Sequence, residues 1–408
     1  MMNKKILKNN LPSFCTSNFD VLKIILLFSK YNNLPTLIES TSNQVNQNGG
    51  YTGLNPSKFS KKIYNLAASI KLNKSMLVLG GDHLGPLPWK NLTSEKAITN
   101  SKKLVKACIK AKYKKIHLDT AIICKNEKRI NKEEIVSRCN NILKDYRAKD
   151  LKNILLVVGT EVPFAGGGQG AKIIPTKINT IKKEYQEYKS IFNINSIYKN
   201  KKFSLVIEPG IEFFHSHVKK SKLKKFLEKK NFSIKNNFSF EAHSSDFQSK
   251  QDLQRLVKNN FQFLKVGPEL TYYYSKAIFS MEKIERNQFK QVSNIKNNLS
   301  KLMKSNNKYW KDYYKGSSKR IEFLKFNSYL DRVRYYWNFK KIEHSKLKLK
   351  KNINNININL LTKILKLSKK QILIKTKLKL NNFEMIIYIN LCKTLQKYYQ
   401  ACGFKTKN

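Results

Sequence analysis

The stretch SMLVLGGDHLGP, residues 75–86, joins an apolar run typical of a buried strand to an adjacent acid and imidazole, Asp82 and His83. Gly80 and Gly81 allow backbone or ligand to approach closely at this point. Such a pair can supply a proton acceptor and a metal ligand, although in a loop it also occurs as a turn or a surface hydrogen bond. Its meaning therefore depends on whether other predicted strands end in the same way.

Short apolar runs recur along the chain, separated by segments with helical spacing of apolar residues, such as Phe59, Ile63 and Leu66. The predicted strands are 11–14, 34–38, 75–79, 114–118, 153–158, 203–207, 237–240 and 261–266. These strand–helix units predict an α/β fold, a (β/α)8 TIM barrel over residues 1–286, because eight parallel strands close naturally. An open doubly wound sheet would accommodate only about six or seven of the units.

Residues 287–408 differ from the barrel region because they contain little glycine and much Lys, Asn, Ile and Leu. Amphipathic spacing, as at Leu360, Ile364 and Leu367, predicts a helical C-terminal extension. The segment SYLDRVRYYW, residues 328–337, combines charges with adjacent aromatic side chains and suits either a subunit contact or packing onto the barrel. Residues 352–359 are rich in Asn and Ile, and we expect a surface loop there.

The formal charge of +53 would ordinarily suggest nucleic-acid binding. Lysine, however, is spread over almost every segment together with Asn, Ile, Tyr and Phe, which share A/T-rich codons. We interpret the charge as a bias of genome composition and expect no specific nucleic-acid partner. A positive field would still raise the association rate of anionic ligands such as sugar phosphates.

The 408 residues and 41% apolar content suffice for a large globular core. No apolar run reaches the length of about 18 residues that a membrane-spanning helix needs, and we expect no membrane association and no secretion signal. The six cysteines show no paired CxxC spacing, which favours free thiols in a reducing compartment. These features predict a cytoplasmic protein.

Functional groups of a TIM barrel lie where its strands end, at the C-terminal face. Each predicted strand here ends in polar residues, and side chains two apart on a strand share a face, as in His117 with Asp119 and Glu241 with His243. All of the 15 glycines except Gly316 and Gly403 lie between residues 49 and 267, almost all in the same loops. The pattern predicts a ligand site at the mouth of the barrel.

Several long motifs resemble, in order, those of the Z-type subunit of class II tagatose-1,6-bisphosphate aldolase. They are SNQVNQNGGYTGLNP, GGDHLGPLPW, KIHLDTAIIC, GTEVPFAGG, EPGIEFFHSHV, FEAHSSDFQ, FLKVGPELTYYYSKAIF and SYLDRVRYYW. The resemblance implies a barrel that partners a separate catalytic subunit, which cleaves tagatose-1,6-bisphosphate to dihydroxyacetone phosphate and glyceraldehyde 3-phosphate. It implies an accessory role in tagatose 6-phosphate or galactitol catabolism, supporting the activity and stability of that partner, and an oligomer.

The label tagatose-6-phosphate kinase is also attached to this family. The glycine-rich run at residues 166–172 lacks the Lys-Ser/Thr ending and the spacing of a phosphate-binding P-loop. We therefore expect no kinase activity and interpret the run as a loop at the mouth.

Class II aldolases hold a divalent metal by histidines and use a nearby acid for proton transfer. On the matching loops we predict His83, His215 and His243 as ligands of a zinc ion, with His217 an alternative to His215 and His117 a further candidate. We predict that Asp82 or Glu161 transfers the proton, and Glu208 is a third candidate acid. The same groups would also fit a remnant site in which histidines and carboxylates only hydrogen bond to one another.

Polar residues at other strand ends are candidates for binding a sugar phosphate. They are Gln44, Asn46, Ser244, Ser245, Lys265 and Gly267. Hydroxyl and amide groups there can bind phosphate, but the serines also suit the start of a helix. The sequence thus predicts an accessory aldolase subunit; the alternative is a metal-dependent sugar-phosphate epimerase or aldolase acting through an enediolate or retro-aldol step.

Overall fold

The computed structural model describes residues 6–159, 173–194, 202–220 and 226–407. Eight parallel strands form a closed barrel in the order β1-β10-β9-β6-β5-β4-β3-β2. They are β1 (Leu11–Cys15), β2 (Thr36–Thr41), β3 (Leu77–Leu84), β4 (Lys115–Leu118), β5 (Leu155–Val158), β6 (Ser204–Val206), β9 (Ser239–Ala242) and β10 (Phe261–Val266). A short antiparallel hairpin, β7 (Glu212–Phe213) with β8 (Val218–Lys219), follows β6. The predicted TIM barrel is confirmed.

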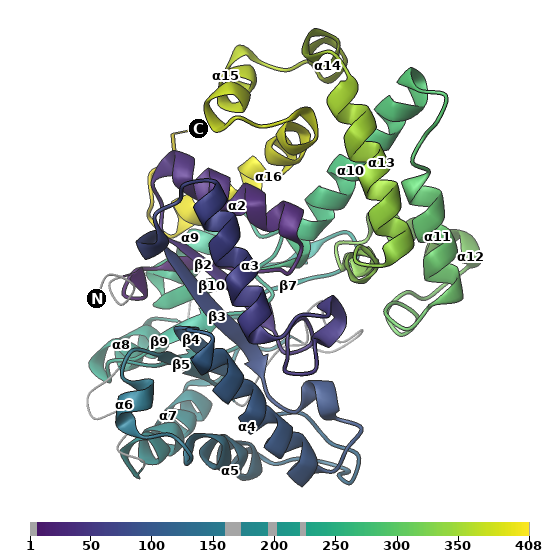
Figure 1. Ribbon diagram of the computed structural model, residues 1–408. Coiled ribbons are helices and arrows are strands. Elements are labelled where there is room, and N and C mark those ends of the chain that lie inside the picture. Colours follow the sequence, from purple (N-terminus) through teal and green to yellow (C-terminus); the bar gives the residue numbers. More distant parts are fainter. Residues whose placement is uncertain (1–5, 160–172, 195–201, 221–225, 408) are drawn as a thin grey trace.

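Helices surround the barrel and extend beyond it (Figure 1). Those that connect strands are α2 (Phe19–Asn32), α3 (Pro56–Ser69), α4 (Ser94–Lys110), α5 (Lys132–Leu143), α6 (Ala148–Leu151), α7 (Ile178–Ile194), α8 (Leu227–Lys235) and α9 (Lys250–Lys258). Those after β10 are α10 (Pro268–Gln288), α11 (Ile295–Ser305), α12 (Ser318–Asn327), α13 (Lys340–Asn355), α14 (Ile358–Leu365), α15 (Lys369–Leu378) and α16 (Asn382–Ala401). Short 3-10 turns are η1 (Gly50–Thr52), η2 (Lys74–Met76), η3 (Leu87–Trp89) and η5 (Arg332–Tyr336).

Helices α2 and α9 begin at polar residues that follow strand ends. The Asn18 side chain accepts hydrogen bonds from the backbone N–H groups of Asp20 and Val21, and Ser249 accepts one from Asp252. These caps satisfy donors that the first turn of a helix leaves free. The sequence thus turns the chain from strand to helix immediately beyond the barrel mouth.

Two glycines let neighbouring strands approach closely near the mouth. A Cβ atom on Gly85 would lie 1.6 Å from the backbone oxygen of Asp119, and one on Gly80 would lie 2.8 Å from Oε1 of Glu39. No larger residue fits at Gly85 without moving the end of β3 away from the chain that leaves β4. Glycine here therefore fixes the spacing between the ends of β3 and β4.

The C-terminal helix α16 packs against α2, α9 and α10 and reaches strand β1. The Tyr398 hydroxyl donates to the carbonyl of Ser245 at 2.7 Å, and Tyr399 donates to the carbonyl of Pro35 at 3.0 Å. Lys23 of α2 forms an ion pair with Glu384 at 2.6 Å. A helix from the last thirty residues thus covers the side of the barrel where β10 meets β1.

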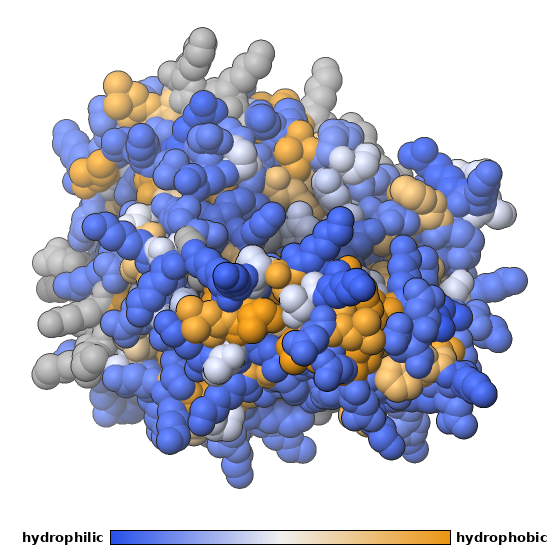
Figure 2. All heavy atoms as spheres, turned by 90° about the horizontal axis from the view of Figure 1, so that it is seen from above, coloured by the Kyte–Doolittle hydropathy of each residue, from blue (hydrophilic) through white to orange (hydrophobic). Residues whose placement is uncertain are grey.

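Helices α14 and α15 lie at the top of Figure 1, away from the barrel strands. Seen from above, the surface is mostly hydrophilic, with hydrophobic side chains gathered in a band across its middle (Figure 2). Leu360, Ile364 and Leu373 of these two helices are exposed. Among the described residues, no helix is long and apolar enough to span a membrane.

The prediction of a loop at residues 352–359 is wrong over most of that range, because α13 continues to Asn355 and α14 begins at Ile358. The Asn352 side chain donates to Oε1 of Glu285 at 2.7 Å and to the carbonyl of Gln291 at 3.0 Å. Ile353 is fully buried. Tertiary contacts therefore hold this asparagine-rich stretch in a helix despite its composition.

Candidate metal centre

Imidazole, carboxyl and ammonium groups from several strands converge at the C-terminal ends of the barrel. The residues are Asp82 and His83 of β3, His117 of β4 and Asp119 just after it, Glu241 of β9 and His243 just after it, and Lys265 of β10. Asp82, His117 and Glu241 are fully buried, and the other side chains are at most slightly exposed. The sequence placed each of them at a strand end, and closure of the barrel brings them together.

An unusual backbone conformation lets Asp82 and His83 face the same centre. Successive side chains of a regular strand point to opposite sides. His83 has φ of +48°, in the left-handed region, and the register between β3 and β4 shifts between Gly81 and Leu84. As a result the ammonium of Lys265 contacts both Oδ2 of Asp82 and Nε2 of His83, the latter at 2.7 Å. Such a conformation in a non-glycine residue is typical of functional sites.

Each of the three histidines directs one ring nitrogen at a carboxylate. Nδ1 of His83 lies 2.8 Å from Asp119, and Nδ1 of His117 lies 2.8 Å from Asp82. Nε2 of His243 lies 3.1 Å from Glu241. In His243 we assign the proton to Nε2, which faces Glu241, and this leaves Nδ1 with a free lone pair. Carboxylates orient metal-binding histidines in this way. Nε2 of His83 accepts from the Lys265 ammonium, and Nδ1 of His117 also lies 3.2 Å from the backbone N–H of His83.

The three imidazole rings form a nearly equilateral triangle. Their centres are 5.0 Å apart for His83 and His117, 5.0 Å for His83 and His243, and 5.1 Å for His117 and His243. Three imidazoles bound to one tetrahedral zinc ion at about 2.0–2.1 Å would place their ring centres about 5 Å apart. The spacing of the ring centres matches three histidines around zinc, but Nε2 of His83 accepts from the Lys265 ammonium, which leaves His117 and His243 as the imidazole ligands.

A buried ion-pair network lies beneath the histidines. The Lys115 ammonium is 2.6 Å from Oε1 of Glu39 and 2.7 Å from Oε2 of Glu241, and all three side chains are inaccessible to solvent. Burial lowers the pKa of Lys115, but Glu241 and Glu39 outweigh burial and raise it above its usual value. Burial raises the pKa of Glu39 even though Lys115 opposes the shift. Lys115 therefore stays charged and holds the two carboxyl groups together.

Asp82 is held as an anion at the centre of the cluster. Burial would raise its pKa, but His83, Lys265 and His117 outweigh burial and place the pKa well below its usual value. The Cys15 thiol donates to Oδ2 of Asp82 at 3.4 Å, and burial raises the pKa of this thiol well above its usual value. Burial and Lys265 lower the pKa of His243, so its ring is neutral and able to bind a metal.

Three observations fit a divalent cation at this centre. Nε2 of His117 and Nδ1 of His243 are buried and have no hydrogen-bond partner within the part of the chain that the structure describes. Asp82, His117, Glu241 and His243 each offer a ligand atom, and these four atoms lie within 4.8 Å of one another. The carboxyl groups of Glu39, Asp82, Asp119 and Glu241 outnumber the ammonium groups of Lys115 and Lys265, so the cluster attracts positive charge.

Of the predicted metal ligands, His243 belongs to this group, His83 lies beside it with Nε2 bonded to Lys265, and His215 lies elsewhere. His117, the further candidate, belongs to the group. Nδ1 of His215 is 2.9 Å from the Ser328 hydroxyl, and the ring faces Tyr314 at 5.7 Å. β6 ends at Val206, and the hairpin that follows carries His215 toward the C-terminal region. His217, the alternative, is exposed and stacks on Phe214.

Of the other candidate acids, Glu208 does not reach the cluster. Glu161 lies outside the described residues. The Glu208 carboxylate accepts the backbone N–H groups of Gly210 at 2.6 Å and Ile211 at 3.1 Å, which fixes its own loop. Asp119 and Glu241 lie in the cluster instead, and their two-residue spacing from His117 and His243 was the available sequence signal.

Lys265 is the only predicted substrate-binding residue that contacts the metal-ligand candidates among the described side chains. The other predicted residues have internal partners. Gln44 accepts from the Thr41 N–H, Asn46 donates to the Ser42 carbonyl, Ser244 donates to Glu212, Ser245 donates to the Lys265 carbonyl, and the Gly267 N–H donates to Asp246. These bonds shape the mouth loops, and phosphate binding by them stays a prediction.

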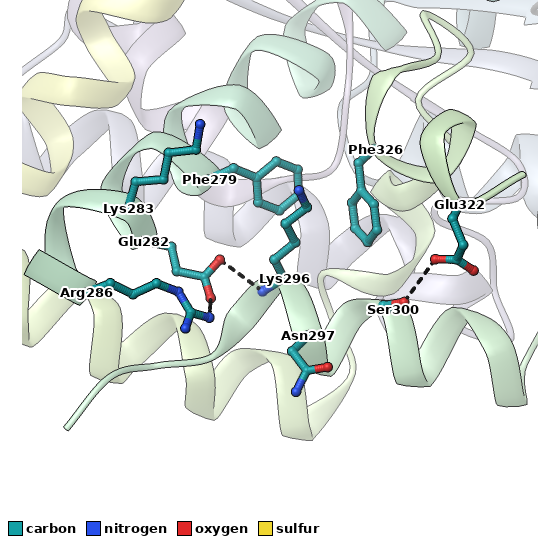
Figure 3. A pocket seen from close by; sticks show the side chains of 9 residues that line it. All are labelled: Phe279, Glu282, Lys283, Arg286, Lys296, Asn297, Ser300, Glu322 and Phe326. Carbon is teal, nitrogen blue, oxygen red and sulfur yellow. Dashed lines mark hydrogen bonds and ion pairs between the residues drawn. The ribbon is translucent and has the colours of Figure 1, made fainter. Parts of the chain in front are cut away.

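A separate surface pocket of about 520 Å³ lies between α10, α11 and α12 and shares no residue with the histidine cluster. Phe279 and Phe326 line it, and Lys296 reaches over both rings (Figure 3). Glu282 pairs with Arg286 at 2.9 Å, as the dashed lines indicate. The pocket lacks the convergent imidazole and carboxyl groups of the barrel mouth.

The fold and the cluster together define a TIM-barrel protein with a buried histidine–carboxylate centre at the ends of its strands. The chain belongs to the family described as D-tagatose-1,6-bisphosphate aldolase subunit GatZ/KbaZ-like, whose model matches residues 1–403. The resemblance inferred from the sequence motifs is thereby confirmed.

A solved structure similar to this chain is that of a probable tagatose 6 phosphate kinase from Sinorhizobium meliloti 1021. The two sequences are 26% identical, the match covers 96% of this chain and 100% of the other chain, and the TM-score is 0.83. A fructose-bisphosphate aldolase from Campylobacter jejuni is 15% identical over 87% of this chain and 92% of its own, with a TM-score of 0.49.

Proposed function

We propose that this chain is itself a metal-dependent enzyme that breaks and re-forms a carbon–carbon bond in a ketose phosphate, as an epimerase or an aldolase. The observation that carries the proposal is the convergence of Asp82, His117, Glu241 and His243, whose ligand atoms lie within 4.8 Å of one another. The family description supplies the substrate class, since it names a D-tagatose-1,6-bisphosphate aldolase. Ring nitrogens of His117 and His243 lack a partner among the described residues, and this favours a bound cation over a remnant site, because unpaired buried polar atoms are costly.

A divalent ion held by His117, His243 and Glu241 would polarise the substrate carbonyl and stabilise an enediolate. In this proposal the anionic Asp82 accepts the proton of the hydroxyl on the carbon that is cleaved. The electron pair of the broken carbon–carbon bond then passes into the enediolate, and the hydroxyl becomes an aldehyde. Lys265 donates to Asp82 and His83 and so orients both groups. Return of the bond to the opposite face of the aldehyde gives an epimer, and release of the aldehyde gives an aldol cleavage.

The test is incubation of the purified chain with zinc or manganese and tagatose 6-phosphate, fructose 6-phosphate or tagatose-1,6-bisphosphate, followed by NMR. We expect conversion that a chelator abolishes and added metal restores. His243→Ala should remove it, whereas His344→Ala, a change of an exposed histidine on α13, should leave it intact. Absence of turnover with every substrate and both metals would refute the proposal.

A second candidate is the accessory role, which the word subunit in the family description favours. In this case the chain binds a catalytic class II aldolase subunit and raises its activity or half-life. The measurement is aldolase activity of the cognate catalytic subunit over a concentration series of this chain. An effect that survives His243→Ala would support an accessory role independent of the metal centre. No change in rate or half-life would exclude it.

A further inference from the structure

The segment of residues 328–336 spans part of the barrel mouth. At one end the Tyr329 ring stacks on Phe247, which follows β9, with ring centres 4.0 Å apart. At the other end Tyr335 packs edge-on against Tyr51, which follows β2, at 5.2 Å. β10 and β1 lie between β9 and β2 in the barrel. A piece of the C-terminal region therefore borders the sector of the mouth that carries Lys265 and Cys15.

Two guanidinium groups in this segment have no carboxylate partner among the described residues. Arg332 donates from Nε to the Tyr309 carbonyl at 2.6 Å, and Arg334 donates to the carbonyls of Leu330 and Asp331. Both also donate to the Tyr335 hydroxyl, at 3.5 Å from Arg332 and 3.0 Å from Arg334. Their partners are therefore neutral oxygens, which leaves two positive charges uncompensated by direct ion pairs.

The nearest acid compensates only part of this charge. Burial raises the pKa of the Asp331 carboxyl to about 7, although Arg334 opposes the shift. Arg334 and Tyr335 are each partly exposed at the surface. The guanidinium carbons of Arg332 and Arg334 lie 4.8 Å and 4.5 Å from the centre of the Tyr335 ring, and this stacking holds both planes in place.

The arginines lie close to the metal-centre side of the mouth. The Ser17 and Gln44 side chains both lower the pKa of the Tyr51 hydroxyl, which places them near it. Ser17 follows β1 by two residues beyond Cys15, whose thiol contacts Asp82. A chain of contacts thus connects Arg334 through Tyr335 and Tyr51 to the loops beside Asp82.

We propose that Arg334, oriented by Arg332 and Tyr335, binds the phosphate group of a ketose phosphate whose carbonyl end lies at the histidine cluster. The inference rests on the proposed function, since it extends the same site to the far end of the substrate. A planar guanidinium donates two parallel hydrogen bonds to phosphate, and an arginine that is already fixed by stacking loses little entropy on binding. The C-terminal region would then determine specificity for phosphorylated over neutral sugars.

The test is isothermal titration of the full-length chain with tagatose 6-phosphate and with tagatose. Arg334→Gln should weaken tagatose 6-phosphate binding by about tenfold or more, because a lost hydrogen bond to a charged group costs about 1.5–3 kcal/mol. Tagatose binding should change by less than about twofold. Arg334→Lys should restore part of the affinity, and Arg255→Gln, an exposed control on α9, should have no effect. Equal weakening of both sugars, or of neither, would overturn the inference.

A second measurement does not depend on the stability of the variant. Crystals of the unaltered chain soaked in tagatose 6-phosphate should place the phosphorus beside Arg334, and a phosphate bound elsewhere would overturn the inference. Turnover is measured separately by NMR. An inactive chain that loses phosphate-dependent binding in Arg334→Gln contradicts the proposed function but supports this phosphate site. An active chain whose Arg334→Gln variant binds both sugars normally contradicts only the phosphate site.

Discussion

Replacement of the buried Lys115 by Met should destabilise the barrel strongly. The ammonium lies 2.6 Å and 2.7 Å from two carboxyl groups, and none of the three side chains is accessible to solvent. Removing one partner of a buried ion pair costs about 3–5 kcal/mol, because the remaining charge is left in a poorly solvated place. Since Glu39 and Glu241 both lose their partner here, we expect a loss of about 5 kcal/mol in the free energy of unfolding at pH 8.

The loss should depend on pH with a definite sign. Burial already raises the pKa of Glu39, and removal of Lys115 raises it further. A carboxyl group whose pKa is higher in the folded state than in the unfolded state stabilises the folded protein at low pH. This contribution is fully present below the pKa of the unfolded state, about 4.3, and is lost as the pH rises through the pKa of the folded state. The defect of Lys115→Met should therefore be largest at pH 8 and shrink toward pH 5.

The assay is urea denaturation followed by circular dichroism at pH 8, 6.5 and 5. Lys183→Met is the matched control, because Lys183 forms an ion pair with Glu133 at 2.7 Å on the exposed surface. The free energy of unfolding of this variant should hardly differ from that of the unaltered chain. Adding Glu39→Gln and Glu241→Gln to Lys115→Met should recover part of the stability. Equal losses for Lys115→Met and Lys183→Met, or a loss that grows in acid, would refute the ion-pair interpretation.

Three further changes test the site. Gly85→Ala should lower the free energy of unfolding by about 3 kcal/mol in urea denaturation, because its Cβ would lie 1.6 Å from the Asp119 carbonyl; unchanged stability would show that the ends of β3 and β4 move apart freely. His117→Ala should weaken zinc binding in equilibrium dialysis by more than about a hundredfold, since even residues that only orient ligands contribute about 10–100-fold, whereas equal affinity in His117→Ala and His344→Ala would remove His117 from the site. Burial raises the pKa of Glu212 to about 8, so Glu212→Gln should raise the melting temperature relative to the unaltered chain at pH 9 and have little effect at pH 5; the opposite order would contradict a buried, protonated carboxyl.

The barrel was predictable because its signal is local. Each strand is a short apolar run, and the structure places a barrel strand within a few residues of every predicted one. The largest difference is β3, which continues to Leu84 although Gly80 and Gly81 suggested that it ended at residue 79. Gly80 belongs to the strand because the Glu39 side chain fills the space beside it. A contact of this kind between two strands cannot be inferred from the sequence of one strand alone.

The sequence predicted that the site lies at the strand ends, but it predicted less well which residues form the site. Asp82, His83 and His243 meet as expected, but His117 joins them because β4 brings it beside Asp82. The left-handed backbone of His83 depends on packing between strands and has no sequence signature in a histidine. The contact of residues 328–336 with Tyr51 and Phe247 is likewise a tertiary event between segments far apart in the chain.

The most direct measurement of the metal centre is an anomalous difference map from zinc-soaked crystals of this chain, recorded on both sides of the zinc absorption edge. We predict one strong peak between His117, His243 and Glu241, within about 2.0–2.1 Å of one ring nitrogen of each histidine. No peak at this position, or a peak at His215 and His217 instead, would contradict a metal centre at the mouth of the barrel.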